Sequence, residues 1–189
     1  MIRHLTMTTL PEDIITPRLI LRLINKDIME ACLNGKLDVA TRELGAAIPA
    51  ELMEHPGSLI YSLRQLANDP LYAPWSARAI ILPETRQMIG LIRFHSSPNP
   101  EYLQRYVRDA VEFGYEVFPA WQRQHYATET LEAVMTWAQR AHGIHHFVAS
   151  VSPENTPSLQ LIARFGFHKI GEEIDETDGI EYVFLRTAD

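Results

Sequence analysis

The feature that most constrains the fold of this chain is a predicted strand joined to an amphipathic helix by a short polar loop. Residues 111–118 predict the strand, and apolar side chains then recur at the spacing of a half-buried helix, at Leu131, Val134, Met135 and Ala138. The main-chain N–H groups of residues 124–127 would lie at the helix N-terminus, where unpaired donors and the helix dipole stabilise an anion. The loop therefore predicts either a phosphate site or an ordinary strand-to-helix turn.

A second segment, residues 151–167, favours the phosphate site. It predicts a strand end, a short helix capped by Asn155 or Thr156 with a proline in its first turn, and a stop at Gly166. In order and spacing the two segments resemble the GNAT acetyltransferase superfamily, specifically its RimJ/RimL-like branch. The family's acyl-CoA loop, Q/R-x-x-G-x-G/A, is matched by residues 122–127. Its second motif, N-x-x-S before a helix that ends in G-F, is matched by Asn155, Ser158, Gly166 and Phe167.

Further matches at residues 16–22, 89–92 and 113–115 extend the resemblance over residues 16–185. It implies an α/β (α+β) fold with a mixed, mostly antiparallel central sheet, splayed at the cofactor site and flanked by helices. It also implies transfer of the acetyl group of acetyl-CoA to a primary amine, by direct attack in a ternary complex and without a metal. The cofactor-binding residues that it implies are Tyr115, Val117, Gln122, Arg123, Gln124, His125, Tyr126, Ala127, Asn155 and Ser158.

The chain departs from the family pattern at two positions. His125 stands where the loop normally has glycine, a residue that tolerates a positive φ and a close approach to phosphate. Histidine also tolerates a left-handed conformation, at a cost of about 1 kcal/mol, so the loop either keeps its shape or loses the diphosphate to the bulk of the ring. Ile162 occupies the position of a tyrosine acid found in many superfamily members. These departures leave a second interpretation open, a catalytically degenerate acyl-CoA-binding or regulatory module.

Acyl transfer to an amine needs a proton acceptor and a proton for the leaving thiolate. Glu112 and Glu116 alternate with apolar residues, so both carboxylates point to one face of the strand. The resemblance implies a glutamate base on this strand, and we choose Glu112. Burial would raise the pKa of its carboxyl toward neutrality. The alternative is that both glutamates are solvated. The resemblance implies that Ser158 relays a proton to the thioester sulfur; the alternative is that its hydroxyl bonds to the backbone of its own helix. It also implies that backbone N–H groups at residues 115–117 donate to the oxyanion.

Composition limits the remaining classes of function. The chain has 189 residues, 46% of them hydrophobic, which is enough for one domain without a disulfide or metal. A net charge of -7 argues against a nucleic-acid binder and slightly favours cationic acceptors. The single cysteine, Cys32, predicts a small core residue, and no apolar run is long enough to cross a membrane. We expect a cytoplasmic protein, monomeric or homodimeric, whose amine acceptor is a small molecule or a protein N-terminus.

The remaining elements are predicted from local signals. A helix should start with a capping box at Asp27 and Glu30 and end near Asn34 and Gly35. Residues 96–108 predict a surface loop or a wall of the substrate site, and the acidic run 172–178 predicts a solvated hairpin or a site that attracts an ammonium group. His145 and His146 should face opposite sides of a strand, which argues against a metal cluster with His142. The other predicted elements are helices over 37–44 and 59–67, hairpins over 77–94 and 170–185, and a strand over 145–151.

Overall fold

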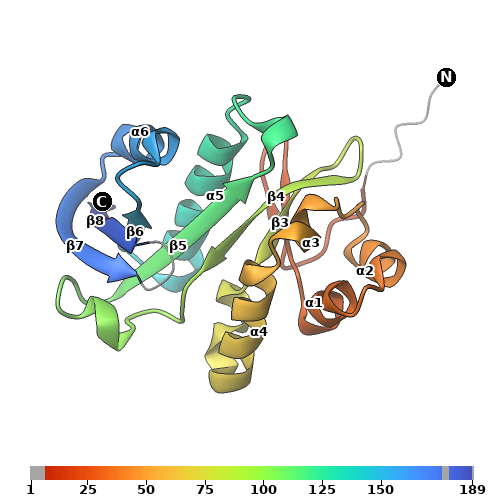
Figure 1. Ribbon diagram of the computed structural model, residues 1–189, viewed down its shortest axis with the longest axis horizontal. Coiled ribbons are helices and arrows are strands. Elements are labelled where there is room, and N and C mark those ends of the chain that lie inside the picture. Colours follow the sequence, from red (N-terminus) through yellow and green to blue (C-terminus); the bar gives the residue numbers. More distant parts are fainter. Residues whose placement is uncertain (1–6, 176–178, 189) are drawn as a thin grey trace. The chain divides into compact units, whose positions relative to one another are not determined.

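The computed structural model describes residues 7–175 and 179–188 (Figure 1). Their contacts group into two units, one with the residues up to Arg93 together with Tyr115–Val134, the other with Phe94–Gly114 and the residues from Met135 onward. Two strands and one helix, β4 (Gln87–Phe94), β5 (Ala110–Val117) and α5 (Tyr126–His142), run from one unit into the other. The strands follow the order β1-β2-β3-β4-β5-β6-β8-β7 in an open, mostly antiparallel sheet, as the resemblance implied.

The strands of the first unit are antiparallel neighbours. Short β1 (Ile14–Ile15) pairs with β2 (Ile20–Leu23), which pairs with β3 (Arg78–Leu82), and β3 forms a hairpin with β4. Ile20 lies opposite Ile81, and both are buried. The predicted hairpin of residues 77–94 is thus confirmed. The sequence did not predict β1, because two residues are too few to show an alternating pattern.

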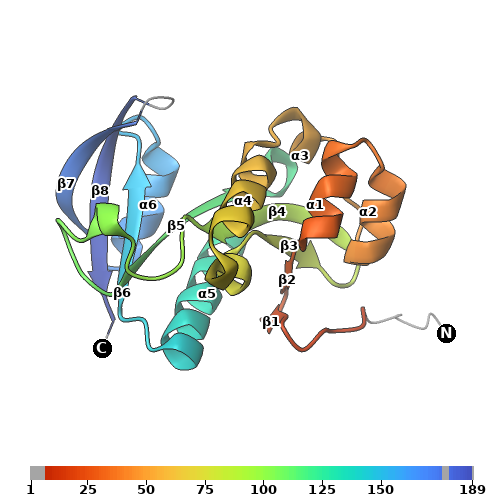
Figure 2. The same ribbon diagram turned by 90° about the horizontal axis from the view of Figure 1, so that it is seen from below.

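The same unit contains the helices that lie between β2 and β3: α1 (Lys26–Leu33), α2 (Leu37–Leu44), α3 (Glu51–Glu54), α4 (Gly57–Asn68) and the 3-10 helix η1 (Pro70–Trp75). Helices α1, α2 and α4 lie beside one another in both views (Figures 1 and 2). Their buried faces join one hydrophobic cluster with β3 and β4, and this cluster includes Cys32, as predicted.

The start of α1 differs from the prediction. Its N-cap is Asn25, whose side chain accepts a hydrogen bond from the Ile28 N–H at 2.9 Å, so the capping box at Asp27 and Glu30 is wrong. Asn25 lies two residues earlier, and its short amide reaches the N3 position without help from a glutamate. The predicted stop is confirmed, with Asn34 as the C-cap and a left-handed Gly35 after it.

The second unit holds the other end of the sheet. Strand β5 pairs in parallel with β6 (His146–Val151), and β6 pairs antiparallel with β8 (Gly179–Thr187), which pairs with β7 (His168–Asp175). The β5–β6 pairing covers Ala110–Glu112 with His146–Val148, although both strands continue further. Strands β6, β7 and β8 lie side by side in Figure 2, near helix α6 (Thr156–Arg164). The turn at residues 176–178 of the predicted closing hairpin lies outside the described residues.

The connection from β4 to β5 is anchored more firmly than a surface loop. It contains the turn η2 (Glu101–Leu103), and Leu103 is only 3% exposed in a small core with Ala110, Val148 and Val183. The Tyr106 ring lies over Gly171, where an added Cβ would stand 2.5 Å from the ring. The Tyr106 hydroxyl donates to Glu173 at 2.6 Å, and Arg105 pairs with the same carboxylate.

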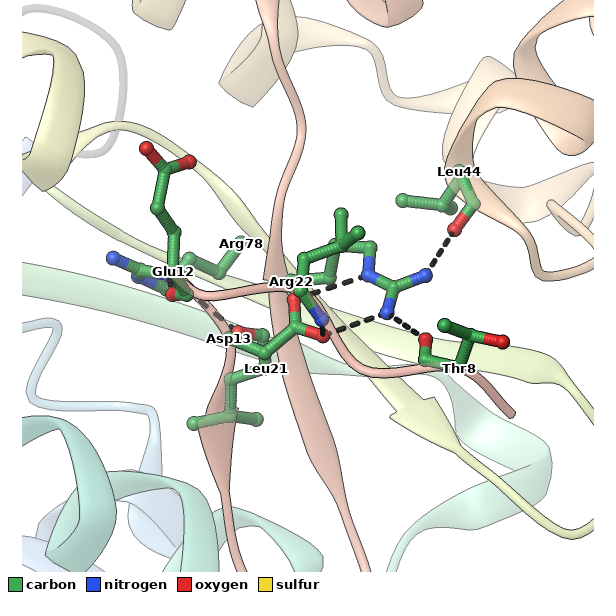
Figure 3. Close-up of polar contacts among 8 residues, drawn as sticks. Thr8, Glu12, Asp13, Leu21, Arg22, Leu44 and Arg78 are labelled. Atoms are coloured by element: carbon green, nitrogen blue, oxygen red, sulfur yellow. Dashed lines mark hydrogen bonds and ion pairs between the residues drawn. The ribbon is translucent and has the colours of Figure 1, made fainter. Parts of the chain in front are cut away.

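Two buried arginines hold the segment before β1 against the sheet (Figure 3). The Arg22 guanidinium donates to both carboxylate oxygens of Asp13, at 3.0 and 2.6 Å, and to the carbonyls of Thr8 and Leu44. Arg78 donates to the carbonyls of Glu12 and Pro74, and burial lowers its pKa to about 10. Both arginines are 5% exposed or less, so these hydrogen bonds replace the contacts with water that each guanidinium loses on burial.

Candidate active site

The predicted anion-binding loop runs from the end of β5 through a 3-10 turn, η3 (Pro119–Trp121), to the start of α5. Two of its residues, Arg123 and His125, have left-handed backbones with φ of 61° and 64°. Of the two alternatives for His125, the structure therefore shows the left-handed backbone that histidine was expected to tolerate. Whether the ring displaces the diphosphate stays open. Each left-handed side chain costs about 1 kcal/mol, so the rest of the loop must stabilise this shape.

The start of α5 leaves main-chain donors available to a ligand. The Glu129 N–H makes the first helical bond, to the His125 carbonyl at 3.1 Å, so His125 is the residue from which the helix begins. By helix geometry, the N–H groups of Tyr126, Ala127 and Thr128 then have no partner within the helix. They lie at the positive end of a 17-residue helix. The prediction had placed these donors at residues 124–127, so the helix starts slightly later than expected.

An ion pair between Arg18, which precedes β2, and Glu129, in the first turn of α5, holds this loop in place. Glu129 accepts from the Thr16 hydroxyl, the Arg18 main-chain N–H and the Arg18 Nε, at 2.5, 2.9 and 2.6 Å. Arg18 also donates to the Gln124 carbonyl at 3.1 Å and lies over the Tyr126 ring. Partial burial acts to raise the pKa of Glu129, but the hydrogen bonds from Thr16 and Arg18 outweigh it and lower the pKa.

Sequence reasoning noted the match at residues 16–22 but missed the role of Arg18 and did not single out Glu129. A signal was present, since a glutamate in the first turn of a helix is favoured by the dipole. Its partner lies 111 residues away along the chain, and no local pattern identifies such a partner.

The loop is also tied to the strand before it. The Gln122 side-chain amide donates to the Val117 carbonyl at 2.9 Å, so this predicted cofactor residue makes a contact within the chain. On β4, Gly90 lies against the Glu116 carbonyl, and an added Cβ would stand 2.2 Å from that oxygen.

Glu116 itself is exposed, whereas Glu112 on the same strand is buried. The alternative that both glutamates are solvated is therefore wrong for Glu112. The assignment of oxyanion donors at residues 115–117 stays a prediction.

In the second unit Glu112 lies at the centre of a polar cluster. Its carboxylate accepts from the Ser150 hydroxyl at 2.6 Å and the Tyr102 hydroxyl at 2.8 Å, and His95 Nδ1 lies 3.3 Å from its Oε2. Burial acts to raise the pKa of Glu112, but His95, Ser150 and Tyr102 outweigh it and lower the pKa to about 2. The predicted rise toward neutrality is wrong, because three donors from other segments stabilise the charged form.

The second motif builds the start of α6. Asn155 is the N-cap, and its side chain accepts from the Ser158 N–H at 3.2 Å, which confirms the predicted capping role. Ser158 is half-buried, and its role as a proton relay stays a prediction. Ile162 is 1% exposed and belongs to the core, so this position supplies no acid.

Other residues have structural partners. His145 and His146 bond through Nδ1 to the carbonyls of Ala188 and Arg108. In the described part of the chain, no three His, Cys, Asp or Glu side chains are grouped so that they could hold a metal ion. Within residues 7–175 and 179–188, no helix is long and apolar enough to cross a membrane. Burial raises the pKa of Cys32, which makes it a weak nucleophile.

The sheet order, the loop before α5 and the capped α6 are those of the GNAT acyltransferase fold. Residues 18–168 match the acetyltransferase (GNAT) domain family, which covers most of the chain and parts of both units. The protein therefore belongs to the GNAT acetyltransferase family, as the sequence motifs predicted, and it is an N-acetyltransferase.

Comparison with known proteins supports the RimJ/RimL-like branch. The chain is 31% identical over 159 residues to the uncharacterized N-acetyltransferase YoaA of Bacillus subtilis, with 82% of each chain covered. It is 30% identical over 89 residues to the ribosomal protein uS5-alanine N-acetyltransferase of Escherichia coli, covering 47% of this chain and 43% of that one. A structure of RimL, a ribosomal L7/L12 α-N-protein acetyltransferase in complex with coenzyme A, shares the fold with a TM-score of 0.57 and 18% identity, covering 94% and 98% of the two chains.

Proposed function

We propose that this protein transfers the acetyl group of acetyl-CoA to the α-amine of a protein or peptide. The observation that carries the proposal is the left-handed His125 at the start of α5, since it keeps the family's phosphate turn without the family's glycine. The relative named as a ribosomal protein uS5-alanine N-acetyltransferase supports a polypeptide acceptor over a small amine. In this proposal the enzyme works in the cytoplasm, as a monomer or homodimer.

In the proposed complex the diphosphate of coenzyme A accepts hydrogen bonds from the main-chain N–H groups at the start of α5. The loop residues 122–127 shape this cradle, and the Arg18–Glu129 pair keeps it closed around the turn. Tyr115 and Val117 on β5, with Asn155 and Ser158 at α6, contact the rest of the acyl carrier. These contacts follow from the family motifs and are proposals for this chain.

In the proposed reaction the amine attacks the thioester carbonyl directly. The new C–N bond forms, the C–S bond breaks, the amine loses a proton and the thiolate gains one, with Ser158 as the relay to sulfur. Glu112 is the proposed general base, which accepts the amine proton directly or through water and passes it on to solvent. Because its pKa is about 2, it is ionised at neutral pH before the reaction. The buried Cys32 takes no part, which agrees with direct attack on the thioester.

The test is calorimetry with acetyl-CoA followed by a thiol-release assay against a panel of amines. The panel contains peptides that begin with alanine or serine, an N-blocked alanine peptide as the matched control, spermidine and an aminoglycoside. We expect micromolar binding of acetyl-CoA and turnover with the free-amine peptides but not the blocked one. Turnover with spermidine or the aminoglycoside alone would reject the polypeptide acceptor.

Binding of acetyl-CoA without turnover on any amine would favour the degenerate module that His125 and Ile162 suggested. The absence of binding would reject both functions. Thiol release that does not depend on an amine would indicate hydrolysis of the thioester, which also contradicts the proposal.

A further inference from the structure

An arginine near the end of strand β4 contacts helix α4. The Arg93 guanidinium lies over the Tyr61 ring, 4.0 Å from the ring centroid, at the place where α4 passes over β4 (Figure 2). The Tyr61 hydroxyl accepts a hydrogen bond from the Gln65 side-chain amide at 3.0 Å, which holds the ring in position. Tyr61 and Arg93 are both partly exposed, so solvent reaches this contact.

Polar atoms on the buried side of this contact have no hydrogen-bond partner. Nη1 of Arg93 and the Ser62 hydroxyl are both buried, and neither makes a hydrogen bond within the part of the chain that the structure describes. Both lie beside the buried Tyr72, where burial raises the pKa of Tyr72 to about 12 while Ser62 and Arg93 act to lower it. Buried polar atoms in folded proteins almost always have partners, so two such atoms beside one tyrosine require an explanation.

Arg93 also has no carboxylate of its own. Of the aspartates and glutamates in residues 7–175 and 179–188, none forms an ion pair with it. The buried Arg22 of the same unit, in contrast, binds both carboxylate oxygens of Asp13. A half-buried guanidinium held flat on a ring, without an anion from its own chain, is suited to bind the anion of a ligand. A carboxylate matches its planar fork of donors.

The position of Arg93 on β4 relates it to the proposed site of acyl transfer. Three residues before it, Gly90 lies against the Glu116 carbonyl of β5, within the segment of the proposed oxyanion donors. Three residues of a strand span about 10 Å. An extended peptide covers the same length in about three residues. If the N-terminal amine of an acceptor lies at residues 115–117, a side chain that reaches Arg93 comes from its second to fourth residue.

We propose that Arg93 binds the carboxylate of an acidic residue at position two, three or four of the acceptor peptide. The proposal rests on the proposed function, which it deepens by naming the class of acceptor. The Tyr61 ring holds the guanidinium, and the carboxylate supplies acceptors for Arg93 Nη1 and the Ser62 hydroxyl. The net charge of -7 repels an acidic peptide at long range, so the selectivity must come from this contact.

The first experiment uses the wild-type protein and three pairs of peptides that begin with alanine. Within each pair the peptides differ only by glutamate or glutamine, at position two, three or four, and all assays have the same ionic strength. At one of these positions we expect the glutamate peptide to have a KM about tenfold lower than its glutamine partner. The physical reason is that a hydrogen bond to a charged group contributes more than a neutral one.

The second experiment repeats the preferred pair with variants of Arg93. Arg93→Met keeps an unbranched stem over Tyr61 but has no charge, so the ratio of the two KM values should fall to about one. Arg93→Lys keeps the charge without the fork of donors and should retain part of the preference. Arg64→Gln, which changes an exposed arginine of α4, is the matched control and should keep the full ratio. A purely structural Arg93 would change both KM values alike and leave their ratio unmoved.

Urea unfolding with coenzyme A present measures binding without turnover. A ligand that binds only the folded protein raises the unfolding midpoint. We expect the preferred glutamate peptide to raise the midpoint of wild type more than its glutamine partner, and this difference to vanish in Arg93→Met. Free glutarate is the probe for a site that takes any small carboxylic acid. A rise with glutarate as large as that with the peptide would overturn the assignment to an acceptor.

The outcomes separate this inference from the proposed function. If wild type acetylates the peptides with equal KM values for glutamate and glutamine at all three positions, the inference is overturned while the function stands. A preference that Arg93→Met retains overturns it as well. If no amine is acetylated, the proposed function fails, and the urea midpoints still decide the site: an Arg93-dependent rise supports a carboxylate site for peptides, and no rise overturns it.

Discussion

At the scale of single residues, the left-handed His125 decides how the loop tolerates the loss of glycine. The turn is already formed, so His125→Gly keeps its shape and removes the bulk of the ring next to the phosphate cradle. We expect this variant to bind acetyl-CoA several-fold more tightly in calorimetry.

His125→Ala is the control, since alanine also removes the ring but pays the left-handed strain of about 1 kcal/mol. It should be less stable than His125→Gly in urea unfolding. Weaker binding of acetyl-CoA by the glycine variant would contradict the prediction and show that the imidazole is a ligand.

Gly90 is a second position where the absence of a side chain is required by close packing. A Cβ there would stand 2.2 Å from the Glu116 main-chain oxygen, and a backbone atom cannot move aside as a side chain can. We expect Gly90→Ala to lower the free energy of unfolding by about 1–3 kcal/mol, measured by urea denaturation. Gly57→Ala is the matched control, because nothing lies within 4 Å of an added Cβ at the start of α4. Equal stability of the two variants would show that β4 and β5 have more room than the distance indicates.

At the scale of elements, the Arg18–Glu129 pair links the chain before β2 to the start of α5. Glu129→Gln keeps the size of the side chain but removes the charge that holds Arg18, so the loop should lose its brace at the Gln124 carbonyl. We expect a loss of acetyl-CoA affinity of up to about tenfold, or about 1.4 kcal/mol, in calorimetry. Stability should change little, since Arg18 is 45% exposed and such pairs contribute at most about 1 kcal/mol.

Glu30→Gln provides the control for this prediction. Its carboxylate pairs with Lys26 on the exposed face of α1, at 3.6 Å, and should affect neither binding nor stability. If both variants bind acetyl-CoA as wild type does, the brace has no part in shaping the loop.

At the scale of the whole molecule, the buried Arg22–Asp13 pair joins the N-terminal segment to the sheet. Asp13→Asn leaves the Arg22 charge buried with weaker partners, and a buried pair that loses one member typically costs about 3–5 kcal/mol. Urea unfolding should show this loss, while Asp38→Asn on the exposed side of α2 should be neutral. A change below about 1 kcal/mol would mean that water replaces the lost charge.

The Glu112 cluster also predicts how stability depends on acid. The pKa of its carboxyl falls from an ordinary 4.5 to about 2 in the fold, so the unfolded chain binds more protons between these values. Its contribution, on the order of 3 kcal/mol, is present above pH 4.5 and is lost as the pH falls toward 2. Urea unfolding between pH 5 and 3 should therefore show a steeper acid loss in wild type than in Glu112→Gln. Equal slopes in the two proteins would contradict the depressed pKa.

Much of the fold and part of the candidate site could be predicted from the sequence, because the signals for them are local. The strand–loop–helix of residues 111–138 is set by apolar spacing, the helix α2 has its predicted bounds, and Asn155 caps α6 through a residue three positions away. The cap of α1 was misplaced because two polar residues there, Asn25 and Asp27, compete for one role. Local signals rank such alternatives poorly.

The sequence by itself determined the family and most of the order of the elements, because these depend on neighbours within a few residues. Only the tertiary structure decided the environment of Glu112 and the partner of Glu129. The strand pattern alone would place Glu112 in a half-exposed row, and its low pKa comes from His95, Tyr102 and Ser150. These residues lie 10 to 38 positions from Glu112 along the chain. Only the folded sheet brings their hydrogen-bond donors to one carboxylate.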